Sequence, residues 1–306
     1  MFQKLNYFIA LFVVLFALQS CQKEALTTVP TPITTAVETQ EIPIQFEVTI
    51  DNGLLSFPTT EDYENAIEYL HDYDKEALAE WNASIGFSSL QSYYNTNEIS
   101  EENREVAEET FASLLNPDRM IKIGQNIIMV DMAEESNYVL IGGNTAQIKD
   151  LKKKSLNNKS IQSYSNEVNV LDILGGDDSS LFQKASYCDS NSTEWVPAGY
   201  CNPNILEYRL RYFKAGIYYS LKATYKGNSG GCQELKLVNL VNGFAENRKE
   251  TITFSPITAI GSGSSVSNKP YSSAKRLKSY SMHCNFQLLD DDGYLQDLGN
   301  RTITCD

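Results

Sequence analysis

The chain has little of what metal sites and membrane spans are built from. Its 306 residues include two histidines, His71 and His283, and six cysteines, none in a C-x-x-C spacing. A structural zinc site needs a cluster of such ligands, so no metal is expected, and nothing in the sequence indicates another cofactor. Long apolar runs are also scarce, since the run from Tyr7 to Leu18 is too short to span a bilayer.

Basic residues are in short supply as well. Lys and Arg number 25 against 39 Asp and Glu, which gives a formal net charge of −14. A nucleic-acid partner is therefore not expected, because phosphate binding depends on Lys and Arg. The deficit is local: residues 41–135 carry 21 acids and 4 bases, whereas residues 181–306 carry 11 acids and 14 bases. Such a break is typical of two structural units.

The N-terminal residues have the build of an export signal, an apolar run that ends in Leu18-Gln19-Ser20-Cys21. They resemble the signal of bacterial lipoproteins, which implies that cleavage leaves Cys21 as a lipid-bearing N-terminus whose acyl chains, such as palmitate, anchor the protein in a membrane. Gln22 is not the aspartate typical of inner-membrane retention, and Gln22-Lys23-Glu24 resembles the export tag of Bacteroidota surface lipoproteins. We therefore expect an outer-membrane location, on the cell surface or the periplasmic face.

Composition and turn signals divide the chain into five segments. Hydrophobic residues make up 42% of it, and its 18 tyrosines also favour a packed core over disorder. We expect an α+β N-terminal domain followed by an all-β antiparallel sandwich domain. The segments are a lipoprotein signal peptide (1–21), a Thr- and Pro-rich tether (22–43), the α+β domain (44–154), a polar linker (155–180) and a disulfide-bonded β-sandwich (181–306).

Local signals place the first elements of the α+β domain. Asn52-Gly53 between apolar runs predicts a hairpin. A helix is expected to begin within Pro58–Asp62, which supplies a capping hydroxyl and acids for the first turn. Asp74 is expected to cap a second helix that ends before Gly86, and Ser100 to open a third.

Alternation of apolar and polar residues predicts strands in the second half. Residues 206–212 and 217–225 both alternate, with Ala215-Gly216 between them. A two-residue turn there pairs Tyr212 with Tyr219 and leaves the two apolar faces on the same side. Several such strands separated by turns are typical of an antiparallel sandwich.

The cysteines of the second half indicate disulfides, because clustered cysteines in an exported domain usually pair. Cys188 and Cys201 are close in sequence and are the first expected pair. Cys284 shares a strand face with apolar residues and is expected to be buried and bridged. Five cysteines allow two bridges and one free thiol in fifteen ways: Cys188, Cys201, Cys232, Cys284 and Cys305.

A weak candidate ligand site lies between the first expected pair. A Cys188–Cys201 bridge would pin a loop that displays Tyr187, Trp195 and Tyr200 beside polar side chains. Aromatic faces flanked by polar groups suit a glycan or protein ligand. The alternative is that Trp195 simply packs over the end of the sandwich.

A basic stripe is expected on one face of the sheet. Its members are Arg209, Arg211, Lys222 and Lys226. It would meet either an anionic polymer or, as the favoured alternative, the acidic first domain of the same chain.

No catalytic residue can be assigned from the sequence. Gly227-Asn228-Ser229-Gly230-Gly231 resembles the nucleophile motif of chymotrypsin-like proteases, but that chemistry needs a histidine base, and only His71 precedes Ser229. A glycine-rich turn is the favoured interpretation. Asp290-Asp291-Asp292-Gly293 lacks the spaced acids of a known calcium loop and indicates a hairpin turn.

Part of the first domain resembles a group of uncharacterised Bacteroidota lipoproteins that contain a domain of unknown function. The resemblance covers about residues 54–141 and implies an exported lipoprotein, without any catalytic residue. The matching residues are Phe57, Glu61-Asp62-Tyr63, Ile67, Leu70, Trp81, Gly86-Phe87-Ser88-Ser89-Leu90 and Ile121-Lys122-Ile123-Gly124.

These observations favour a non-enzymatic lipoprotein of the outer membrane or cell surface that acts in binding or assembly. Its expected partners are the membrane, through the lipid anchor, and a glycan or surface protein. One alternative is an exported hydrolase whose site is not visible in the sequence, and another is a structural envelope component. Carboxylates or a Ser/His pair converging in one cleft would favour the hydrolase.

Overall fold

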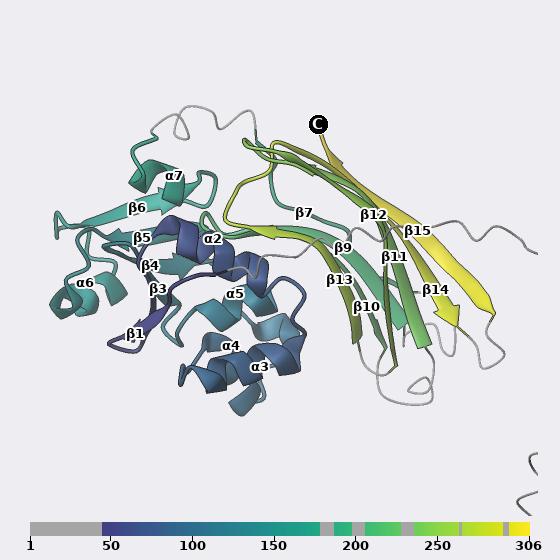
Figure 1. Ribbon diagram of the computed structural model, residues 1–306, viewed down its shortest axis with the longest axis horizontal. Helices are drawn as coiled ribbons and strands as arrows, with labels where there is room; N and C mark the ends of the chain where they lie inside the picture. Colours follow the sequence, from purple (N-terminus) through teal and green to yellow (C-terminus); the bar gives the residue numbers. More distant parts are fainter. Residues whose placement is uncertain (1–44, 178–186, 198–205, 228–235, 263–264, 290–293) are drawn as a thin grey trace, which may run out of the picture. The chain divides into compact units, whose positions relative to one another are not determined.

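The computed structural model describes residues 45–177, 187–197, 206–227, 236–262, 265–289 and 294–306. Residues Pro43–Asp306 form one compact unit, and the expected signal peptide and tether lie outside the described residues. Helices occur in the N-terminal part and long strands follow them (Figure 1). Among the residues described, no helix is long and apolar enough to cross a membrane.

The N-terminal part is built on a six-stranded sheet in the order β1-β2-β3-β4-β5-β6. Its strands pair antiparallel except for β2 with β3. The predicted hairpin at Asn52-Gly53 is confirmed, because Asp51 pairs with Leu54 and both turn residues have positive φ. The strands are β1 (Thr49–Asp51), β2 (Leu54–Phe57), β3 (Met120–Ile123), β4 (Asn126–Asp131), β5 (Ser136–Leu140) and β6 (Ile161–Ser165).

Side-chain caps decide where the helices of this part begin. Thr59 and Asp74 accept hydrogen bonds from the first turns of α2 and α3, so both predicted helix starts are confirmed. The helices are α2 (Thr60–Tyr69), α3 (Lys75–Ser84), α4 (Leu90–Thr96), α5 (Glu109–Leu114), α6 (Ile148–Lys152) and α7 (Val170–Leu174), with 3-10 turns η1 (Glu101–Asn103) and η2 (Thr145–Gln147).

The prediction that Ser100 opens a helix is wrong. Ser100 precedes only the short turn η1, and the helix proper, α5, starts nine residues after Ser100, with the Glu108 carboxylate as its cap. That carboxylate accepts a hydrogen bond from the Phe111 N–H at 2.8 Å. A buried acid thus does the capping that the sequence pattern ascribed to an exposed serine.

The segment 155–180, expected to be an irregular linker, contains regular secondary structure. Residues Ile161–Ser165 form β6, which extends the sheet beside β5, and Asn169 caps α7 through its side chain. The polar composition of this segment belongs to an edge strand and a capped helix rather than to an irregular connection.

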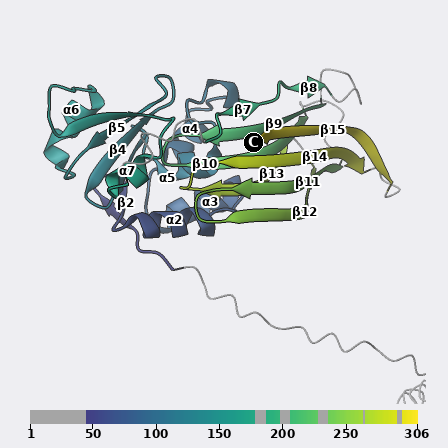
Figure 2. The same cartoon turned by 90° about the horizontal axis from the view of Figure 1, so that it is seen from above.

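Two antiparallel sheets make up the C-terminal part, as expected. One contains β13-β10-β9-β7, with β8 also paired to β9, and the other has the order β12-β11-β14-β15. Figure 2 shows their long strands running along a common direction. The strands are β7 (Asn191–Ser192), β8 (Val196–Pro197), β9 (Leu206–Lys214), β10 (Tyr219–Gly227), β11 (Lys236–Glu246), β12 (Thr251–Ser262), β13 (Ser265–Ser273), β14 (Ser279–Leu289) and β15 (Leu295–Cys305).

The register of the β9–β10 hairpin differs from the expected one by two residues. Tyr212 pairs with Leu221, not with Tyr219, because the connection spans Ala215–Tyr218 rather than two residues. The Ala215 N–H donates to the Tyr218 carbonyl, and Gly216 has φ of 75°. An even shift keeps every side chain on its predicted face, so the alternation alone could not distinguish the two registers.

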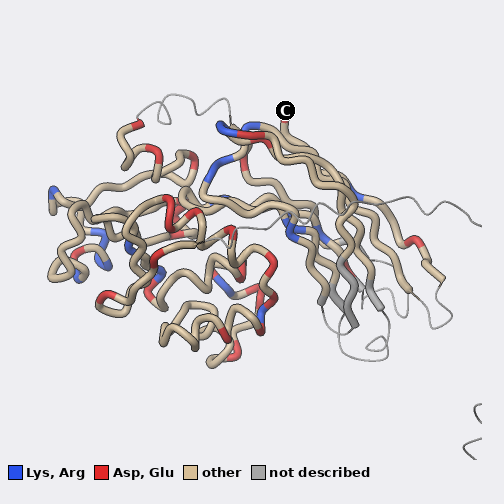
Figure 3. Tube along the Cα trace, in the orientation of Figure 1, with Lys and Arg blue, Asp and Glu red and all other residues tan. Residues whose placement is uncertain are grey.

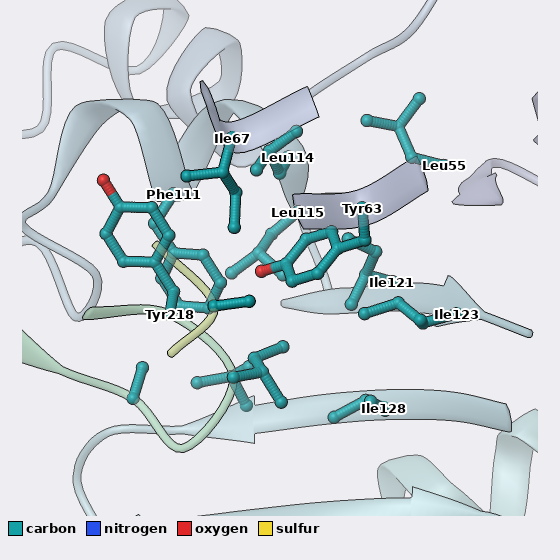
Figure 4. Close-up of a cluster of buried hydrophobic side chains, with 14 of the residues drawn as sticks. Leu55, Tyr63, Ile67, Phe111, Leu114, Leu115, Ile121, Ile123, Ile128 and Tyr218 are labelled. Atoms are coloured by element: carbon teal, nitrogen blue, oxygen red, sulfur yellow. The ribbon is translucent and has the colours of Figure 1, made fainter. Parts of the chain in front are cut away.

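Two buried clusters matter for the site. Between the two C-terminal sheets, Tyr208 stacks on Phe286 with ring centroids 4.2 Å apart. A second cluster joins the helices to the first sheet and also includes Phe213 and Tyr218 from the β9–β10 hairpin (Figure 4). The helical part and the sandwich are therefore joined by one apolar cluster, and the sandwich also has a cluster of its own.

Candidate functional site

The aromatic loop expected between Cys188 and Cys201 is not built as predicted. Cys188 forms its disulfide with Cys305, 117 residues away in the sequence. Tyr200, Cys201 and Cys232 lie outside the described residues. The bridge ties the segment before β7 to the end of β15 instead of closing a short loop.

The expected ligand residues of that region contact the chain itself. The Arg209 guanidinium lies 4.3 Å from the centre of the half-buried Trp195 ring, and the Arg276 guanidinium lies 5.1 Å from that of Tyr187. Arg211 lies over the Phe213 ring at 5.4 Å. These contacts favour the alternative in which the rings pack against the sandwich.

Two of the four members of the basic stripe face acidic residues of the helical part, as the favoured alternative predicted. Lys222 lies 3.4 Å from Glu109 of α5, and Arg209 lies 3.8 Å from Glu101 of η1. The Lys226 side chain lies outside the description. Figure 3 shows the acidic residues of the helical part and the basic residues of the strands. Charge of opposite sign therefore accompanies the shared apolar cluster where these elements meet.

The expectation that Cys284 is both buried and bridged is only half right. It is fully buried, as predicted, but it is a free thiol. Burial raises its pKa above the ordinary value, so the thiol stays protonated and unreactive.

A cavity of about 290 Å³ lies beside β7 and β9, and Arg211 is among its lining residues. One lysine and one glutamate of its wall are paired with each other. Lys214 bonds to Glu167, and Arg276 lies 3.2 Å from the same carboxylate. Because these groups neutralise one another, the network joins the loop after β6 to the sandwich rather than offering free charge to a ligand.

A larger cavity, here called the polar cleft, has a volume of about 620 Å³ and lies between the helical part and strands β10, β12 and β13. Most of its lining residues are polar or charged. Among its lining residues are His71, Tyr73, Glu108, Glu109, Thr110, Lys222, Thr258, Ser267 and Lys269, together with Asp72, Asp74, Lys75, Glu76, Glu101, Thr224, Ile257 and Asn268.

Buried charges form one side of the polar cleft. Glu108 is 1% exposed, and Lys269 donates a hydrogen bond to the Thr110 hydroxyl at 2.5 Å. Burial raises the pKa of Glu108, but Lys269 and Lys222 together with the Phe111 N–H outweigh it and hold the pKa below its usual range. Burial also lowers the pKa of Lys269. These groups hold one another in place at the cleft wall.

His71 and Ser272 are hydrogen-bonded beside this wall. The His71 Nδ1 lies 2.6 Å from the Ser272 hydroxyl oxygen, and its Nε2 lies 3.8 Å from an Asp72 carboxylate oxygen. Burial, reinforced by the positive charge of Lys269, lowers the pKa of His71 to about 4. The imidazole is therefore neutral at physiological pH.

Local sequence patterns do not indicate this cluster. They offer His71 only as a base for Ser229, which lies outside the described residues. Lys269 and Ser272 are three residues apart and would lie on opposite faces of a regular strand. The pairing of β13 with β10 shifts register between Asn268 and Tyr271, and this bulge cannot be read from the alternation.

Among the described residues, no cluster of three His, Cys, Asp or Glu side chains is arranged to hold a metal ion. The Asp290–Gly293 turn lies outside them.

Comparisons with known proteins give little further information. No protein-family model matches the chain, and no curated protein matches its sequence. Among solved structures, it is similar to a DUF4848 family protein from Bacteroides thetaiotaomicron at 9% identity, covering 85% of this chain and 100% of the other. The TM-score is 0.25, which is too low to support an argument about fold or function.

Proposed function

We propose that this chain is a lipid-anchored protein of the outer membrane that binds a glycan in the polar cleft. The lipoprotein-like signal that ends at Cys21 supports export of the chain and its attachment to a membrane through lipid. We assign the ligand site to the cleft rather than to the region around Trp195, because Arg209 lies over the Trp195 ring.

The chemistry of the cleft wall carries this proposal. Sugar hydroxyls both donate and accept hydrogen bonds, and the wall offers exposed carboxylates as acceptors, the exposed Lys75 as a donor and the exposed hydroxyls of Thr258 and Ser267 as either. Tyr73 adds one aromatic face for a sugar ring. An apolar ligand would have to desolvate these polar groups without pairing them, which is costly.

The charge of the cleft wall limits which class of glycan can bind. The wall carries six carboxylates against three lysines, and His71 is neutral. A polyanionic glycan would be repelled by this excess, so we infer a neutral or amino-bearing glycan. The negative charge of the wall agrees with the excess of acids in residues 41–135, which supply much of the wall.

The test is a glycan-array binding assay with soluble residues 22–306. Ser267 is exposed on β13 within the cleft, so Ser267→Trp fills the cleft without removing a core contact. We expect the chain to bind neutral or amino glycans and Ser267→Trp to lose at least tenfold in affinity. Trp195→Ala is the matched control and should retain binding.

Two results would overturn this proposal. Loss of binding in Trp195→Ala with retention in Ser267→Trp would return the site to the region around Trp195. Absence of glycan binding by the folded chain would favour a surface-protein ligand or a structural envelope role.

A further inference from the structure

Strand β13 brings two side chains towards His71, a lysine that lines the polar cleft and a serine hydroxyl that bonds to the imidazole. Asn268 pairs with Ala223, whereas Tyr271 pairs with Leu221, so one extra residue of β13 is accommodated between these pairs. This bulge reverses the alternation, and both Val266 and Tyr271 reach the core of the sandwich. Lys269 and Ser272 consequently both approach His71 on the opposite face. Bulges often serve to redirect a side chain in this way.

The hydrogen bond between His71 and Ser272 has the geometry of a base and a nucleophile. At 2.6 Å, the serine hydroxyl can donate to the Nδ1 lone pair if the imidazole carries its proton on Nε2. The Asp72 carboxylate lies 3.8 Å from Nε2, beyond hydrogen-bond distance, so it acts on the imidazole through its charge. The serine and the imidazole thus form a hydrogen-bonded pair, with a carboxylate near the second ring nitrogen.

We propose that Ser272 and His71 form an esterase site that removes acyl groups from hydroxyls of a glycan bound in the polar cleft. This inference rests on the proposed function for its substrate, an O-acylated glycan. The pair itself stands on the geometry of three side chains from two distant parts of the chain, residues 71–72 and Ser272.

The reaction balances with water as the only co-reactant. The Ser272 oxygen attacks the ester carbonyl carbon while its proton passes to His71 Nδ1. The tetrahedral intermediate collapses, the C–O bond to the sugar breaks, and the sugar oxygen takes the proton from the imidazolium. Water then attacks the acyl-serine with His71 again as base, releasing the carboxylic acid and restoring the serine.

Two features of the surroundings act on the imidazole. His71 is neutral at physiological pH, so its lone pair is free to accept a proton, and its lowered pKa of about 4 makes it a weak base. Lys269 approaches His71 from the Ser272 strand, and its positive charge contributes to this lowering of the pKa. His71 lines the cleft and Ser272 bonds to its ring, so a glycan held there would lie beside the imidazole.

The experiment treats soluble residues 22–306 with a fluorophosphonate at pH 7.5 and maps the modified peptide by mass spectrometry. We expect one phosphonyl group on Ser272 and none in Ser272→Ala. His71→Gln should slow the labelling by about 100-fold, since a positioned general base contributes at least that factor. Ser163→Ala changes an exposed serine of β6 and is the matched control, with unchanged labelling.

A second readout is hydrolysis of p-nitrophenyl acetate, which should follow the same order among the variants. Asp72→Asn changes an almost fully exposed carboxylate, so it tests the positioning role without endangering the fold. It should lower the rate and leave the melting temperature unchanged.

Absence of Ser272 labelling in the wild-type chain overturns the esterase proposal, whether or not the variants fold. If glycan binding then persists and is blocked by Ser267→Trp, the proposed binding function still stands. Labelling of Ser272 without any glycan binding would instead retain the nucleophile and reject the glycan as its substrate.

Discussion

The ring of Phe111 on α5 stacks on that of Tyr218, which precedes β10, with centroids 4.9 Å apart and an interplanar angle of 11°. Both side chains are completely buried. This contact joins the helical part to the sandwich through apolar packing. The two parts are therefore expected to unfold together rather than one after the other.

Replacement of this ring should destabilise the whole unit. We expect Phe111→Ala to lower the free energy of unfolding by about 3–5 kcal/mol, because the cavity it leaves adds to the lost transfer energy. Urea denaturation followed by far-UV and near-UV circular dichroism should give coincident transitions. Leu156→Ala, at a side chain that is 56% exposed, is the control and should change little. Two separate transitions in the wild-type chain would contradict a shared apolar cluster.

A polar contact fixes the β9–β10 turn against the first sheet. The buried Asn137 amide donates to the Ala215 carbonyl at 2.9 Å, and a Cβ at Gly216 would lie 2.3 Å from the same amide nitrogen. Gly216→Ala should therefore cost about 1–3 kcal/mol from the positive φ, with the clash in addition. Gly176→Ala also has positive φ but nothing within 4 Å, so the difference in thermal stability between the two variants measures the clash.

The disulfide offers a direct chemical test. A non-reducing digest should contain a peptide pair joined through Cys188 and Cys305, and Cys284→Ala should leave that link intact. Because the bridge closes a loop of more than a hundred residues, Cys305→Ser should lower the free energy of unfolding by up to about 5 kcal/mol. A Cys188–Cys201 link in the digest would contradict the structure.

His71 should make stability depend on pH in a definite direction. Its folded pKa of about 4 lies below the ordinary 6.5, so the unfolded chain binds more protons between these values. The free energy of unfolding therefore rises with pH across this window, and the contribution of His71 is lost as the pH falls from 6.5 towards 4. A shift of this size corresponds to at most about 3 kcal/mol.

The measurement compares urea denaturation of the wild-type chain and His71→Gln at pH 7.5 and 5. The variant should lose less stability between the two values. NMR titration gives an independent check because the chain has two histidines, so His71→Gln assigns both imidazole signals. A His71 midpoint near 6.5 would show that its burial and the nearby charge of Lys269 do not act as described.

Local chemistry made some elements predictable. Asn52-Gly53 sets a hairpin because both residues tolerate positive φ, and Asp74 starts α3 because its carboxylate pairs with a free N–H of the first turn. Each effect involves residues at most three positions apart, so tertiary context did not alter it. The α4 helix, capped by Ser89, was missed because its short length gives no clear apolar period.

The sequence by itself determined the hairpin, the first helix caps and the faces of β9 and β10, because each depends on neighbouring residues. It also predicts the lipid anchor at Cys21. Only the tertiary structure decided the partner of Cys188, the two-residue change in hairpin register and the bulge that brings Lys269 and Ser272 towards His71. These depend on contacts between segments as much as 201 residues apart. No local periodicity records such a contact, since it is selected by the packing of the whole core.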